Sequence, residues 1–204
     1  MTYAGHILII LSLALAISAC AGRYKPIDPQ EQIGRIDQEV FEKHAKPQTP
    51  LEEYVSRVGK RIQLVSEYAG NNYQFKVISF DVPEIEFDTE NKSITITTAL
   101  LQQLNDEAEL AAVLSLAAGK HANSDNLDQM TATNLFRAGY DPQALIDLQT
   151  QYFYATSKNQ AHWLATIYPS ELTAGTITYN TSFISKMPKG LQRNAEAYKK
   201  QLNG

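Results

Sequence analysis

The sequence is poor in cysteine and in clustered basic residues, and each shortage excludes a class of protein. Its 204 residues include one cysteine, Cys20, so the chain cannot form an internal disulfide. The net charge is -4, and no run of Lys and Arg interleaved with aromatic residues is present. Nucleic-acid binding needs a basic surface that neutralises phosphates, so the composition argues against that function.

Long apolar stretches are also scarce. The apolar run at residues 7–17 is too short for a membrane-spanning helix, which needs roughly 20 apolar residues. Its length is typical of a signal peptide, and it ends in the sequence ISAC at residues 17–20. That ending resembles a bacterial lipobox, in which the Cys thiol is acylated. We therefore predict a signal peptide at residues 1–19, lipidation of Cys20 and a lipidated tether at residues 20–29.

The residues after Cys20 bear on location. Ala21 and Gly22 follow it, without the Asp that commonly retains lipoproteins at the inner membrane. The lipobox resemblance thus implies an anchor in the bacterial outer membrane on its periplasmic face. The alternative is an ordinary signal peptide or an uncleaved anchor with an incidental Cys. If Cys20 carries lipid, no Cys–His nucleophile is available.

Residues 30–204 have the composition of one globular domain. Alternation at residues 73–80 predicts a strand, and residues 84–88 and 93–98 are predicted to pair as a hairpin. Residues 173–190 are predicted to be irregular. Apolar spacing predicts helices at 31–46, 51–65, 99–104, 106–121, 125–137 and 142–156, a short one near Trp163 and one from Leu191. The predicted fold class is α+β, a mostly helical single domain with a small antiparallel sheet.

Familiar catalytic motifs are missing as well. The sequence has no Gly-rich phosphate loop and no Gly-x-Ser-x-Gly elbow. Asp106, Glu107 and Glu109 are clustered acids, but they stand at a predicted helix start, where carboxylates cap the helix and favour its dipole. We interpret them as a solvated N-terminal turn. His162 and His44 are interpreted in the same structural way, as a packing residue and a helix end.

Five blocks of sequence occur in an order and spacing that together are specific. They are LEEYVSRVGKRI at 51–62, VPEI at 82–85, ITITTALL at 94–101, NDEAELAAVL at 105–114 and AGYDP at 138–142. Over residues 31 to about 170 the chain resembles the HtpX-type zinc metallopeptidases (gluzincins), specifically their periplasmic, BepA-like lipoprotein branch. The resemblance implies a metallopeptidase-like (zincin-like) core.

The zinc ligands of that family are replaced in this chain. The family holds zinc through a His-Glu-x-x-His helix, whose Glu is the general base, and through a carboxylate from the next helix. Alignment places Leu116 at the first His, Ala117 at the base, Lys120 at the second His and Asn126 at the third ligand, while Asp128 is retained. Leu and Ala offer no lone pair and a Lys ammonium repels a cation. We expect no catalytic residue, no zinc and no other cofactor.

Two further departures concern the surroundings of the family's site. Only five residues separate Lys120 from Asn126, so the region between the two former ligand helices is shortened and the cover of the cleft is missing. Residues 164–170 match a later family block loosely, without its His and Arg, so no role is transferred to Tyr168. We also expect the Lys120 ammonium to pair with Asp128 in place of the metal.

A rebuilt metal site is the alternative. His121, Asp125 and Asp128 would share one face if a single helix ran through all three. The competing interpretation, which we favour, ends one helix near His121 and begins another after a capping residue at 123–125.

The resemblance also implies that polypeptide adds to an edge of the small sheet, which requires no metal. The main hypothesis is a catalytically inactive, outer-membrane-anchored homologue that binds unfolded or assembling envelope proteins or a partner peptidase. Charges at Glu86, Asp88, Glu90 and Lys92 could instead block such pairing. The alternatives are an active metallopeptidase with an unconventional metal site and a structural lipoprotein subunit of an envelope complex. The predicted peptide-binding edge consists of Ile85, Phe87, Ser93, Ile94, Thr95 and Ile96.

Overall fold

The computed structural model describes residues 49–122, 126–158, 160, 162–168 and 172–203, which belong to one compact unit that begins near residue 48. The signal peptide, Cys20, the tether and the predicted helix at 31–46 lie outside the described residues. Among the residues that are described, no helix is both long and apolar enough to cross a membrane.

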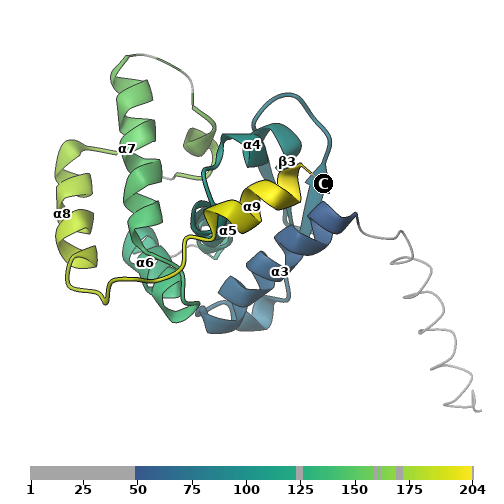
Figure 1. The fold of residues 1–204 in the computed structure, drawn as a ribbon, viewed down its shortest axis with the longest axis horizontal. Helices are drawn as coiled ribbons and strands as arrows, with labels where there is room; N and C mark the ends of the chain where they lie inside the picture. Colours follow the sequence, from purple (N-terminus) through teal and green to yellow (C-terminus); the bar gives the residue numbers. More distant parts are fainter. Residues whose placement is uncertain (1–48, 123–125, 159, 161, 169–171, 204) are drawn as a thin grey trace, which may run out of the picture. The chain divides into compact units, whose positions relative to one another are not determined.

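The fold is mixed α and β, and mostly helical (Figure 1). Two short 3-10 helices, η1 at Ala69–Asn71 and η2 at Trp163–Thr166, lie between larger elements. The strands are β1 at Gln74–Ile78, β2 at Ile85–Asp88 and β3 at Ser93–Thr97. The described α-helices are α3 at Pro50–Val65, α4 at Thr98–Gln103, α5 at Glu107–His121, α6 at Leu127–Arg137, α7 at Gln143–Ser157, α8 at Ala174–Ile184 and α9 at Ala195–Leu202.

Local sequence explains where two of the longest helices begin. Thr49 caps α3 by accepting a hydrogen bond from the Glu52 amide at 3.1 Å, and Pro50 occupies the first turn, where its missing N–H costs nothing. Asp106 caps α5 in the same way through the Glu109 amide, at 2.9 Å. The predicted starts of both helices are confirmed.

The sheet has the strand order β1-β3-β2, so β3 is the central strand. β2 and β3 form the predicted antiparallel hairpin, in which Ile85 pairs with Ile96 and Phe87 with Ile94. β1 runs parallel to β3, with Phe75 opposite Ile94. The prediction of a purely antiparallel sheet is therefore wrong, because alternation reveals a strand but not its direction.

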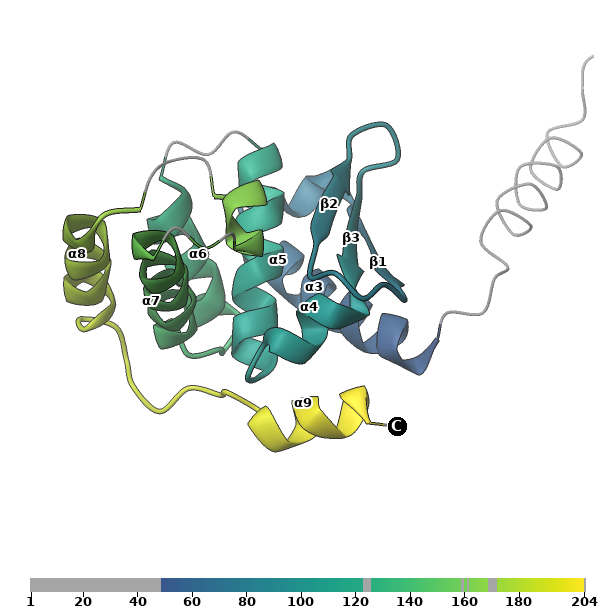
Figure 2. The same ribbon diagram turned by 90° about the horizontal axis from the view of Figure 1, so that it is seen from above.

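Helix α5 forms the centre of the core. It has no polar stripe, and its residues from Glu107 to Gly119 are all buried, as expected of a helix that is apolar all round. Figure 2 shows α5 between the sheet on one side and α6 and α7 on the other, with α8 outermost. α3 packs against both α5 and β1.

Residues 173–190 contain a helix that the sequence interpretation missed. α8 spans Ala174–Ile184 and is capped by Thr173, whose side chain accepts a hydrogen bond from the Thr176 amide at 3.1 Å. Its first turns contain Gly175 and several β-branched residues, which have weak helix propensity. Tertiary contacts through its buried Asn180 and Ile184 supply what local propensity does not.

Candidate functional site

The positions aligned with the zinc ligands lie on the C-terminal half of α5 and at the start of α6. Leu116 is fully buried in the core, and Ala117 lies one residue further on at the core's margin. Lys120 is exposed, and its ammonium donates a hydrogen bond to the Thr166 carbonyl. Asn126 is exposed just before α6. The side chains of Leu116 and Ala117 are hydrocarbon and have no atom that can coordinate zinc. The Lys120 ammonium carries a positive charge and has no lone pair, so it cannot coordinate zinc either.

Asp128 is the acceptor at the centre of a polar network built from four separate elements. Its carboxylate accepts hydrogen bonds from the Tyr168 hydroxyl and from Asn180 Nδ2, the latter at 2.7 Å. The Gln149 amide donates to the Tyr168 oxygen at 2.5 Å and accepts from Asn180 at 3.2 Å. These four residues, here called the Asp128 network, join α6, α7, α8 and the segment after η2.

The Asp128 network overturns the expected pairing of Lys120 with Asp128. Both carboxylate oxygens of Asp128 already accept hydrogen bonds, while Lys120 is bound to Thr166. Burial, together with the nearby Asp128 carboxylate, raises the pKa of Tyr168 far above its ordinary value. Tyr168 therefore stays protonated at physiological pH and acts as a permanent donor to Asp128.

The rebuilt metal site does not form as a single-helix arrangement. α5 ends at His121, and Asp128 lies on α6, so the two do not share a helix. The His121 ring stacks on Phe87 with 3.6 Å between ring centroids, and Nδ1 lies 3.2 Å from the Tyr73 hydroxyl. Asp125 lies outside the described residues. Across the described ranges, no three His, Cys, Asp or Glu side chains are grouped to hold a metal ion.

The pKa of His121 is lowered by desolvation and, secondarily, by the Lys92 ammonium. His162 is half-buried, and its Nδ1 accepts a hydrogen bond from the Leu164 amide at 3.2 Å. Its ring lies against Tyr152 and Trp163, which confirms the interpretation of His162 as a packing residue. His44 lies outside the described residues.

Of the residues in the predicted peptide-binding edge, Ile85 and Phe87 lie on β2, an edge strand of the sheet, whereas the four on β3 do not lie at an edge. Ser93, Ile94, Thr95 and Ile96 belong to the central strand, whose two edges are already paired with β1 and β2. Their backbone groups cannot accept a further strand. The prediction failed because hairpin pairing alone does not show which of the two strands has another neighbour.

The register of β2 identifies its free backbone groups. The Thr97 amide donates to the Glu84 carbonyl at 3.1 Å, which makes Glu84 and Thr97 a hydrogen-bonded pair. Because such pairs alternate along an antiparallel ladder, Glu86 also faces β3 with its backbone groups. The N–H and C=O groups of Ile85 and Phe87 then point away from β3, toward the unpaired edge of β2, where Ile85 is buried and Phe87 half-buried.

A groove runs beside this edge. Its volume is about 420 Å³, and its walls come from β2, the end of α5 and η2 with the residue that follows it. We call it the β2 groove. Its floor is apolar or small, whereas Lys120 and Glu86 supply charge at its margins. The lining residues are Ile85, Glu86, Phe87, Thr89, Ala117, Lys120, His121, Thr166 and Ile167.

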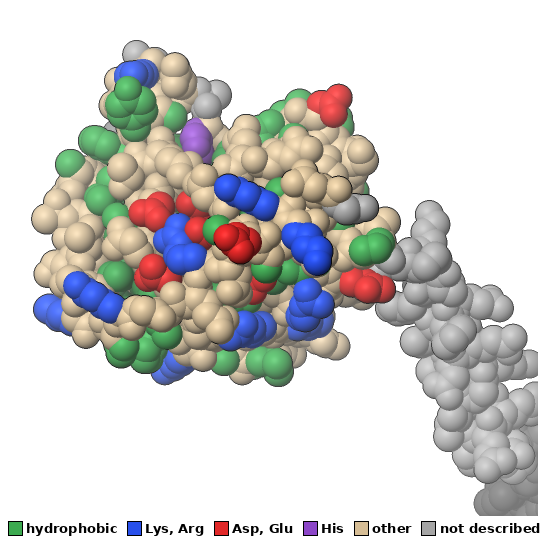
Figure 3. Space-filling model, in the orientation of Figure 1, with side chains coloured by type: hydrophobic (Ala, Val, Ile, Leu, Met, Phe, Trp, Pro, Cys, Tyr) green, Lys and Arg blue, Asp and Glu red, His purple; other side chains and the backbone are tan. Residues whose placement is uncertain are grey.

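The acids at the start of α5 are buried, which corrects their interpretation as a solvated turn. Glu107 accepts hydrogen bonds from the hydroxyls of Tyr54 at 2.5 Å and Tyr140 at 2.7 Å. Arg193 forms ion pairs with Asp106 at 2.7 Å and Asp147 at 2.9 Å. Figure 3 shows acidic and basic side chains interspersed on the face that α9 crosses. Capping by Asp106 was predicted correctly, but burial was not.

Sequence reasoning also missed Gln149, Asn180 and Arg193. The first two are far from Asp128 in sequence, and polar residues on helices carry no local signal of a distant partner.

No protein-family model matches this sequence in comparisons with known proteins, and no curated protein sequence matches it either.

Proposed function

We propose that this chain is a non-catalytic relative of the HtpX-type zinc metallopeptidases that binds extended polypeptide along the free edge of β2. The observation that carries the proposal is the outward direction of the Ile85 and Phe87 backbone groups beside the β2 groove. An incoming strand gains main-chain hydrogen bonds there, and its alternate side chains enter the groove.

Loss of catalysis is supported by the chemistry of the positions beside that edge. Ala117 lines the groove where the family's general base would stand, and Lys120 is bound to the Thr166 carbonyl. Asp128, the acid retained from the third-ligand motif, is occupied by Tyr168 and Asn180. A strand bound at β2 would therefore meet a methyl group and an ammonium, neither of which activates water.

The proposed setting is the periplasmic face of the bacterial outer membrane, with lipid on Cys20 as the anchor. Suitable clients are unfolded or assembling envelope proteins, or a partner peptidase, because these expose extended segments. Glu86 and Asp88 are exposed on β2. Their side chains stand off the sheet face rather than along its hydrogen-bonding edge, so they favour clients with basic residues at alternate positions.

Binding of fluorescein-labelled casein, an unfolded polypeptide, tests the proposal. We expect saturable binding, and we expect amide hydrogen exchange to slow at Ile85 and Phe87 when casein binds. The Glu86 amide should change little, because β3 already protects it. Binding with no added protection at Ile85 and Phe87 would assign the polypeptide to another surface and contradict the edge.

A variant that fills the β2 groove with a bulky side chain also tests the proposal. Thr166 is exposed and lines the groove, so Thr166→Trp should weaken casein binding on the order of tenfold while the fold persists. Thr150→Trp, at an exposed position of α7, is the control and should bind normally. Absence of any casein binding would favour a structural lipoprotein subunit, and chelator-sensitive cleavage would favour an active peptidase.

A further inference from the structure

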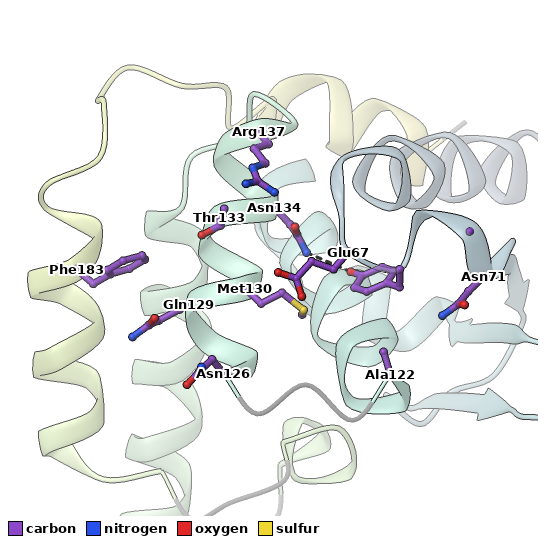
Figure 4. A pocket seen from close by; sticks show the side chains of 12 residues that line it. Glu67, Asn71, Ala122, Asn126, Gln129, Met130, Thr133, Asn134, Arg137 and Phe183 are labelled. Carbon is purple, nitrogen blue, oxygen red and sulfur yellow. Dashed lines mark hydrogen bonds between the residues drawn. The ribbon is translucent and has the colours of Figure 1, made fainter.

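A second and larger cavity lies on another part of the molecule. Its volume is about 750 Å³, and it lies between η1, the end of α5, α6 and α8 (Figure 4). It shares no lining residue with the β2 groove. Amide, hydroxyl and charged side chains predominate on its walls: Glu67, Asn71, Asn126, Gln129, Thr133, Asn134 and Arg137, with Tyr68, Met130 and Phe183 between them.

Opposite charges face this cavity without neutralising each other. Glu67 and Arg137 are both exposed side chains of its wall. Within the described part of the chain, neither forms an ion pair, and neither side chain takes part in a hydrogen bond. By contrast, Arg193 is held by several carboxylates elsewhere. The cavity wall therefore holds one carboxylate and one guanidinium that no described residue pairs with.

Asn134 adds an amide oxygen, an acceptor, to these two charges. The residue is only 1% exposed, and its Nδ2 donates to Ser115 Oγ at 3.3 Å. The same nitrogen lies 3.5 Å from the Tyr68 hydroxyl, as the dashed line in Figure 4 indicates. No donor among the described residues reaches Asn134 Oδ1, which is left open to the cavity. An amide oxygen that lines a cavity and has no donor within the protein can accept hydrogen bonds from the N–H groups of a ligand.

We propose that this cavity binds a zwitterionic ligand of the short-peptide class. The ligand ammonium lies against the Glu67 carboxylate and donates to Asn134 Oδ1, while the ligand carboxylate is held by the Arg137 guanidinium. Met130 and Phe183 provide the apolar wall for a side chain. The volume is within the range of small-molecule sites and admits a ligand of a few residues. The site is independent of strand addition at β2.

To test the proposal, the purified protein is titrated with di-, tri- and tetra-alanine. Binding is measured by calorimetry and by NMR shifts of the backbone amides of Asn134 and Arg137. We expect saturable binding of at least one of these peptides. Its N-acetylated and C-amidated forms should each bind about tenfold more weakly, because each loses one charge-assisted contact. No binding by any of the three peptides at millimolar concentration would overturn the proposal.

Two variants assign the ends of the ligand. In Glu67→Gln the difference in affinity between the free and N-acetylated peptides should shrink, because only the Asn134 contact with the ammonium remains. In Arg137→Gln the free and C-amidated peptides should bind alike. Both positions are exposed, so the variants should fold, and Glu53→Gln on exposed α3 surface is the matched control. Equal binding of the neutral disaccharide cellobiose, insensitive to both substitutions, would replace the peptide class with saccharides and sink the proposal.

Discussion

At the scale of single residues, Tyr168 shows how a side chain acquires a role from distant partners. Its hydroxyl donates to Asp128 and accepts from the Gln149 amide, and both Tyr168 and Gln149 are buried. Neither partner is near it in sequence. The phenol thereby donates to the half-buried Asp128 carboxylate and accepts from the Gln149 amide, which is fully buried and would otherwise lack this partner.

Tyr168→Phe removes this hydroxyl while keeping the ring. We expect the free energy of unfolding to fall by about 1–3 kcal/mol, because the buried Gln149 amide and the half-buried Asp128 carboxylate each lose a partner. Urea denaturation measures the change. Tyr179→Phe is the matched control, since Tyr179 is 58% exposed and accepts one hydrogen bond from Gln129. A loss equal to that of the control would contradict the assigned role of the network.

At the scale of elements, the contact between α3 and β1 depends on Gly59, because glycine has no Cβ that would collide with the neighbouring strand. A Cβ at Gly59 would lie 2.6 Å from ring atoms of Phe75, which is itself 3% exposed and cannot move aside. Gly59→Ala should therefore lower the free energy of unfolding by about 1–3 kcal/mol, despite the better helix propensity of Ala. Thermal or urea unfolding checks this.

Gly175→Ala in α8 is the comparison for that substitution. The nearest atom to a Cβ there is Thr173 Oγ1 at 3.5 Å, an ordinary contact. Stability should stay the same or rise by up to about 1 kcal/mol. If both alanines were equally tolerated, the packing of α3 on β1 would have to be looser than described.

The C-terminal segment is held to the core by Arg193. This guanidinium is the cation that meets Asp106 and Glu109, which are 4% and 0% exposed, and it also reaches Asp147. Arg193→Gln should cost about 1–3 kcal/mol, because it leaves buried carboxylates without their counter-charge. Amide exchange in α9 should quicken as the segment loosens. Lys199→Gln, exposed on α9, should change stability by less than about 0.5 kcal/mol.

At the scale of the whole molecule, two histidines make stability depend on pH. Burial lowers the pKa of His162, and burial with Lys92 lowers that of His121, from a model-peptide value of 6.5. Below that value the unfolded chain binds more protons than the folded one, so this contribution is present near neutral pH and is lost as pH falls.

Denaturation curves between pH 5 and 8 test this dependence. The double variant His121→Gln/His162→Gln should show a shallower fall in stability on acidification than the parent, whereas above pH 7.5 the two proteins should differ by a constant offset. Parallel curves throughout the acid range would mean that neither imidazole is held in its neutral form by the fold.

Much of the secondary structure could be predicted because its signals are local. Apolar spacing with Pro50 and Asp106 as start signals located α3 and α5, alternation located β1, and two segments separated by a short polar turn located the hairpin of β2 and β3. α8 was not predicted, because its residues have weak helix propensity and its stability comes from tertiary contacts. The parallel pairing of β1 was not predicted, because the alternation of apolar and polar residues does not indicate the direction of a strand.

The sequence by itself determined the residue types at the positions aligned with the zinc ligands of the HtpX-type peptidases, since no fold can give Leu116 or Ala117 a lone pair for a metal. Only the tertiary structure decided which strand edge is free and which partners surround Asp128. Both outcomes depend on contacts between residues far apart in the chain. Such contacts form through packing of whole elements, and a local pattern of side chains cannot specify them.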